Sequence, residues 1–216
     1  MITSVLDRIA GRAPVSLIIR HAERSPIVRM EAAFDALLTQ KGKEDARGLG
    51  KRLSALGPIR LYSSPIERCV QTAEYIKRGI TEGDGTGVFE GSLPDLGGPY
   101  ITGLWEDVVR KVEEFGQPVF VRKWFDGELP ESLVMPLEQA ARNQVSILRR
   151  QLGDGAHSSV NVTHDWNIMI LREYFFNLRH DDIAAPPYLD GIAAYMDKGA
   201  LLLLYHDREC TVSSPG

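Results

Sequence analysis

Residues 15–26 have the sequence VSLIIRHAERSP, in which a short apolar run gives way to a polar, basic segment. The apolar half, Val15 to Ile19, has no amphipathic period, which is typical of a central strand covered on both faces. In an α/β sheet, ligands bind at the carboxyl ends of the strands. We therefore expect the basic segment that begins at Arg20 to lie at a ligand-binding edge.

Strand and helix patterns alternate after this segment. From Thr39 the apolar residues recur every three or four positions, and Gly57-Pro58 ends that helix. A second short strand spans 59–62. A second helix follows, for which Ser63 and Ser64 offer N-cap oxygens and Pro65 suits the first turn. Later strands are predicted at 160–163, 192–196 and 200–205. This order predicts a three-layer α/β/α sandwich with a mostly parallel central sheet.

The middle of the chain differs from this alternation. After a glycine-rich loop at 81–87, two amphipathic helical patterns run from Ile101 to Phe115 and from Leu137 to Leu152. We expect them to form a small helical cap inserted at about 90–156 in a single domain that spans 1–216. The aromatic residues of this cap can either line a substrate wall or fill a core, and the core is the commoner fate: Trp105, Trp124 and Phe125.

Composition excludes several classes of protein. The chain has 216 residues with 44% hydrophobic and 25% charged residues, and no apolar run reaches 18 residues. A net charge of −4 does not suit a protein that binds nucleic acid through its phosphates. With only two cysteines, Cys69 and Cys210, a disulfide framework is not expected. We expect a cytoplasmic protein with neither membrane nor nucleic acid as a partner.

The first predicted strand is followed by Arg20, His21 and Arg24. Guanidinium groups can hold phosphate oxygens in pairs, and a neutral imidazole nitrogen can attack phosphorus. The alternative is a solvated loop with incidental charges, which the position directly after a buried strand disfavours. The segment therefore predicts a phosphate pocket.

Two further strand ends carry residues of the same kind. Arg68 lies in the first turn of the helix after the second strand, where a cation opposes the helix dipole unless an anion binds there. The alternative interpretation is that Arg68 forms a surface ion pair with Glu67 or Glu74. His164 and Asp165 follow the strand at 160–163, where they can donate to a phosphoryl oxygen and to a leaving alkoxide. For Asp165 a helix cap is an equally open alternative.

Metal ligation is not predicted. The remaining histidines, His157, His180 and His206, have acidic neighbours but no helical ligand spacing. We expect neither a metal nor another cofactor.

Together, these three strand ends resemble the histidine phosphatase superfamily, the phosphoglycerate-mutase-like proteins that work through a phosphohistidine. The first block, Arg20-His21-x-x-Arg24-x-Pro26, is similar to the acid phosphatase branch, with Ala22 where the family has glycine. The resemblance extends to Ser63-Ser64-Pro65 through Ala73, and to His164-Asp165. It implies that His21 is the nucleophile and Asp165 the general acid. It also implies a set of phosphate-binding residues: Arg20, Arg24, Arg68 and His164.

The resemblance leaves two alternatives open. In size the chain is closer to the mutases and small phosphatases, whose acid is a glutamate soon after the second signature, and Glu90 stands at that place. The implied function is metal-independent hydrolysis of a small phosphate monoester. The alternatives are a phosphomutase and a catalytically weak phospho-ligand binding module. The natural substrate and the oligomeric state are not predicted.

Overall fold

The computed structural model describes residues 2–12, 14–27, 29, 33–153, 155 and 157–212. The strands in these ranges are β1 (Ser16–Arg20), β2 (Ile59–Ser63), β3 (Gly87–Ser92), β4 (Ser158–Thr163), β5 (Gly191–Asp197), β6 (Ala200–Tyr205) and β7 (Arg208–Val212). The helices are α1 (Thr3–Arg8), α2 (Gln40–Leu53), α3 (Glu67–Glu82), α4 (Trp105–Phe115), α5 (Gln117–Phe125), α6 (Leu137–Gly153) and α7 (Asp165–Phe176). Short 3-10 turns lie at Ser54–Leu56 and Pro94–Leu96.

The strands form one sheet in the order β3-β2-β4-β1-β5-β6-β7. The half from β3 to β1 is parallel, whereas β5, β6 and β7 add to β1 as an antiparallel meander. In the parallel half Arg20 lies opposite Thr163, and Ser63 lies opposite Val162. The carboxyl ends of β1, β2 and β4 therefore meet at one edge, as the sequence predicts.

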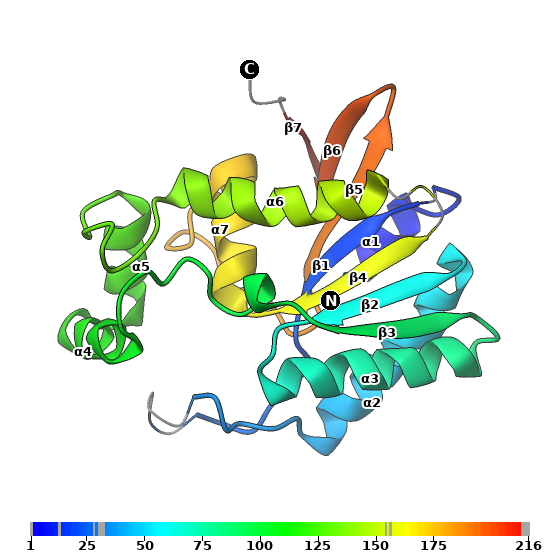
Figure 1. The fold of residues 1–216 in the computed structure, drawn as a ribbon, viewed down its shortest axis with the longest axis horizontal. Helices are drawn as coiled ribbons and strands as arrows, with labels where there is room; N and C mark the ends of the chain where they lie inside the picture. The colour runs from blue at the N-terminus through cyan, green and yellow to red at the C-terminus, as the bar shows by residue number, and fades with distance from the viewer. Residues whose placement is uncertain are drawn as a thin grey trace.

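Helices cover both faces of the sheet (Figure 1). Alternate residues of β1 face opposite ways: Leu17 and Ile19 join the core that contains α1, α2 and α3, and Ile18 joins the core beneath α6 and α7. A strand that is buried on both faces needs a continuous apolar run, which explains the sequence of β1. The three-layer α/β/α sandwich is confirmed.

Helix α2 begins where the sequence places it, because the Thr39 side chain accepts a hydrogen bond from the backbone N–H of Gly42. Glycines also let it approach its neighbours closely. A Cβ on Gly42 would lie 2.1 Å from the carbonyl oxygen of Glu23, and one on Gly50 would lie 2.1 Å from that of Ile76. Helix α2 thus packs tightly on α3 and on the loop that follows β1.

Several details differ from the predictions. Helix α3 begins at Glu67, after the Ser63-Ser64-Pro65 turn, and Ile101 forms a bridge to Val134 instead of a helical turn. Helix α5 was not predicted. The strands β3 and β7 were also missed, because both lie at sheet edges, where the apolar pattern is weak.

The predicted insertion at 90–156 contains elements of two kinds. Helix α6 packs on the sheet, while α4 and α5 extend to one side of the layers (Figure 1). Trp124 and Phe125 of α5 are 2% and 7% exposed and belong to the core. Of the three cap aromatics, only Trp105 lines a cavity.

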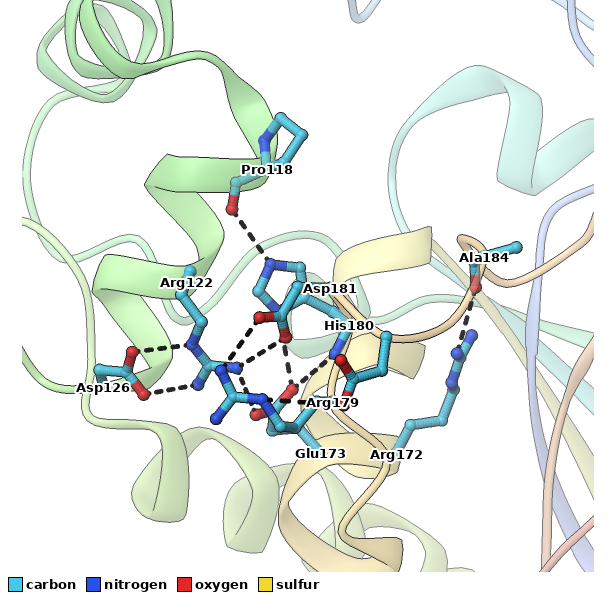
Figure 2. Close-up of polar contacts among 10 residues, drawn as sticks. Pro118, Arg122, Asp126, Arg172, Glu173, Arg179, His180, Asp181 and Ala184 are labelled. Carbon is cyan, nitrogen blue, oxygen red and sulfur yellow. Dashed lines mark hydrogen bonds and ion pairs between the residues drawn. The ribbon is translucent and has the colours of Figure 1, made fainter.

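An ionic network ties α5 to the end of α7 (Figure 2). Arg122 of α5 lies 2.7 Å from the Glu173 carboxylate of α7, and it also pairs with Asp126 and Asp181. Burial lowers the pKa of Arg122, but the hydrogen bonds to Glu173 and Asp126 outweigh this and raise it above its ordinary value. His180 completes the network by donating from Nε2 to the carbonyl of Pro118. The network fixes α5 beside α7, the helix that starts at the sheet edge.

Candidate active site

His21 follows β1 directly and is 2% exposed. Its Nδ1 lies 2.8 Å from the carbonyl oxygen of Ala22. Because a carbonyl can only accept, Nδ1 carries the proton and Nε2 keeps a lone pair. Burial, and next the charge of Arg68, lower the pKa of His21 well below its ordinary value of 6.5. The ring is thus a neutral imidazole with a defined tautomer.

Arg68 connects the two histidines of the site. Its Nε donates to Nε2 of His21 at 3.1 Å, and its Nη2 lies 3.1 Å from Nδ1 of His164. The third nitrogen, Nη1, donates to the carbonyl of Ala33 at 2.7 Å. The side chain is 7% exposed. This buried guanidinium fixes the spacing of both imidazoles, whose ring centroids lie 5.6 Å apart.

His164 follows β4 directly and occupies the N-cap position of α7, where its side chain makes no capping hydrogen bond. Since Nδ1 accepts from Arg68, Nε2 carries the proton and donates to the Ser64 hydroxyl at 2.9 Å. Burial, and next the charge of Arg68, lower the pKa of His164 to about 3. The Cys69 thiol lies 3.7 Å from the same ring, but burial raises its pKa to about 12, so it stays protonated and is no nucleophile.

Arg20 and Asp165 form an ion pair beside the histidines, with 3.0 Å between Nη2 and Oδ2. Arg20 also donates to the carbonyl of Pro186 at 2.5 Å and lies over the Tyr188 ring at 4.3 Å. Its Nε is buried and has no partner among the described residues, and Arg20 itself does not line the cavity described next. Asp165 also accepts from the backbone N–H of Trp166, but it is the first residue of α7, and His164 stands at the N-cap position instead.

A cavity of about 660 Å³ opens over these groups. The polar residues at its base are His21, Arg24, Arg68, His164 and Asp165. Arg24 is partly exposed there and donates to the carbonyl of Ser25. The base of the cavity combines cationic side chains with an imidazole lone pair, which is an arrangement that can bind an anion and attack it.

The structure thus brings together the predicted residues from all three strand ends, except for Glu90. Glu90 lies on edge strand β3, where its carboxylate is 3.4 Å from Arg60, and it does not line the cavity. Sequence reasoning missed two residues of the site. Ser64 was seen only as a helix cap, and Asp95 of the turn after β3 lines the cavity without any motif to reveal it.

The described part of the chain shows neither a metal-binding cluster nor a helix that could span a membrane. Within the described ranges, His, Cys, Asp and Glu nowhere gather in a group of three that could hold a metal ion. In the same part of the chain, none of the helices has the length and apolar character needed to cross a bilayer.

Curated relatives match one part of the chain. The lipopolysaccharide core heptose(II)-phosphate phosphatases of Escherichia coli O157:H7 and of strain K12 / DH10B are each 40% identical to it over 76 residues. This segment is 34% of this chain and spans 38% of the length of those relatives.

Solved structures share the fold at low identity. A phosphoserine phosphatase mutant from Entamoeba histolytica has a TM-score of 0.59 at 17% identity, covering 88% of this chain and 94% of its own. A phosphoglycerate mutase from Bacillus anthracis has a TM-score of 0.56 at 16% identity, covering 93% and 92%.

The family model of the histidine phosphatase superfamily, branch 1, matches residues 16–188. This range includes every strand end that contributes to the cavity. The strand order, the site geometry and this match agree, and the chain belongs to the histidine phosphatase superfamily.

Proposed function

We propose that the protein hydrolyses small phosphate monoesters through a phosphohistidine on Nε2 of His21, without a metal ion. One observation carries the proposal: the proton of His21 is held on Nδ1 by Ala22, so the lone pair of Nε2 lies beside the Arg68 guanidinium. An anion bound by Arg68 would have its phosphorus next to that lone pair.

The reaction has two steps. Asp165 takes up a proton when the phosphate replaces it as the partner of Arg20. Nε2 of His21 then attacks phosphorus, the bond from phosphorus to the ester oxygen breaks, and Asp165 gives that proton to the leaving alkoxide. Water then attacks the phosphohistidine, Asp165 takes up its proton, and the bond between phosphorus and nitrogen breaks to release inorganic phosphate. Arg20 and Arg68 would donate to the phosphoryl oxygens throughout, and His164 would do so once its Nε2–H leaves the Ser64 hydroxyl.

Asp165 is better placed than Glu90 to act as the general acid. Its carboxylate lies at the base of the cavity, while that of Glu90 faces Arg60 on the sheet edge. A proton donor must come within hydrogen-bond reach of the leaving oxygen. Phosphatase names among the relatives favour transfer to water over transfer to a second substrate hydroxyl.

The test is turnover and trapping of the intermediate. We expect the protein to release phosphate from 4-nitrophenyl phosphate with EDTA present, and acid-labile, alkali-stable phosphoprotein to appear on rapid quenching. His21→Ala should lose both, while the control His157→Ala should keep both, because His157 does not line the cavity. Activity that EDTA abolishes and Mg²⁺ restores would refute the metal-independent mechanism. Binding of phosphate by a folded wild type without turnover would indicate a binding module.

A further inference from the structure

The cavity has two chemically different ends. Its base holds the basic and imidazole groups described above, whereas its outer wall comes mainly from the 94–105 loop and from the segment before α2. Apolar side chains dominate that outer wall: Ile27, Phe34, Ile66, Pro99, Ile101 and Trp105. A binding site of this kind holds a polar head group at its base and an apolar group further out.

The apolar wall continues to the mouth of the cavity. Phe34 packs against Trp105 with the rings tilted by 52° and their centroids 5.1 Å apart, yet it remains 43% exposed. Leu104, between the two lining residues Gly103 and Trp105, is 68% exposed. Large apolar side chains that stay in water around a cavity mark a binding surface, because an apolar ligand gains free energy by covering them.

The small number of charged groups on the outer wall also favours an apolar ligand. Apart from Arg24, Arg68 and Asp165, Asp95 is the only charged side chain among the described lining residues, so no further Lys or Arg among them can receive a second phosphate or a carboxylate. Hydrogen-bonding side chains are few: Tyr100 and Gln117 line the wall, and the buried indole N–H of Trp105 has no partner among the described residues. A polyhydroxylated sugar would leave many hydroxyl groups unpaired against this surface.

We propose that the alcohol portion of the substrate is apolar: an alkyl or aryl phosphate monoester with one phosphate, whose chain or ring lies against Phe34, Ile101 and Trp105. This inference rests on the proposed function for the position of the phosphate. Sugar phosphate is the competing class, since curated relatives are named for a heptose phosphate.

The test compares esters with similar leaving groups, namely ethyl phosphate, n-hexyl phosphate and glucose 6-phosphate. Each methylene that leaves water improves kcat/KM by about fourfold. We expect n-hexyl phosphate to exceed ethyl phosphate by at least about tenfold, since only part of the chain is covered, and to exceed glucose 6-phosphate as well. Phe34→Gln should shrink the ratio of hexyl to ethyl, and Met196→Gln, an equally exposed apolar residue on β5, should leave it unchanged.

Binding of ethylphosphonate and n-hexylphosphonate, measured by calorimetry, separates this inference from the proposed function because the bond from carbon to phosphorus is not hydrolysed. If the hexyl compound binds more tightly than the ethyl compound, and Phe34→Gln weakens this preference, the apolar subsite is supported even if none of the esters turns over. Absence of turnover would overturn the proposed function alone. Equal binding of both phosphonates, or a preference for glucose 6-phosphate over the hexyl ester, overturns the inference even if the enzyme is an active phosphatase.

Discussion

At the scale of single residues, the site depends on two histidines that stay neutral. The folded-state pKa of His164 is about 3, against an ordinary value of 6.5. Between these values the unfolded chain binds a proton that the folded protein does not, so the free energy of unfolding falls as the pH falls below about 6.5. We expect His164 alone to cost about 2 kcal/mol of stability between pH 7 and pH 5.

The measurement is urea unfolding at both pH values for the wild type and for His164→Gln. The variant lacks the titrating group, so its loss of stability on acidification should be smaller by about 2 kcal/mol. Asn143→Gln, a substitution of a non-titrating residue at an exposed position on α6, is the control and should lose as much as the wild type. If His164→Gln loses as much too, His164 binds its proton with the same pKa in the native and unfolded states.

The identity of the general acid can also be tested by substituting single residues. Asp165→Asn cannot protonate the leaving oxygen, so we expect kcat for an alkyl phosphate to fall by about 10² to 10⁴-fold. The loss should be much smaller for 4-nitrophenyl phosphate, whose leaving group needs no proton. Glu90→Gln, which alters only the pair with Arg60 at the sheet edge, should leave both rates unchanged. A reversed pattern in the two variants would make Glu90 the acid.

At the scale of secondary-structure elements, the position of α2 controls the loop after β1. Both Gly42 and Gly48 lie in α2, where alanine is favoured by about 1 kcal/mol on helix propensity. Gly48 has open space around it, so Gly48→Ala should stabilise the protein by about 0.5–1 kcal/mol. At Gly42 a Cβ would collide with the carbonyl of Glu23, so Gly42→Ala should destabilise by about 1–3 kcal/mol.

Catalytic activity gives a second measurement for the variants Gly42→Ala and Gly48→Ala. Glu23 lies between His21 and Arg24, so pushing it away from α2 should lower kcat/KM, whereas Gly48→Ala should not change it. A Gly42→Ala variant that is both more stable and fully active would show that α2 can shift without moving the site.

The same elements show what the sequence could predict. The strand β1, the start of α2 near Thr39 and the three groups at strand ends were predictable, because each depends on local patterns and on the rule that parallel strands align their carboxyl ends. Edge strands β3 and β7 were not, since they bury little apolar surface. Asp95 and the bond from His164 to Ser64 were also out of reach, because packing between distant segments creates them.

At the scale of the whole molecule, the base of the cavity is assembled from three distant segments, 20–24, 64–68 and 164–165. A ligand that needs all three binds the folded protein and not the unfolded chain. We therefore expect inorganic phosphate, at 100 times its dissociation constant, to raise the free energy of unfolding by about 2.7 kcal/mol.

The stabilisation by phosphate should depend on Arg68, because its guanidinium reaches from segment 64–68 to both His21 and His164. In Arg68→Met, the same phosphate concentration should raise the unfolding free energy by less than about 0.5 kcal/mol, since the Kd would rise far above it. The comparison uses the increment caused by phosphate, so a change in basal stability does not affect it. Arg110→Gln, at an exposed position on α4, should keep the full increment. If Arg68→Met keeps it as well, phosphate binds outside the three strand ends, and the folded arrangement of this edge serves another purpose than holding a phosphoryl group.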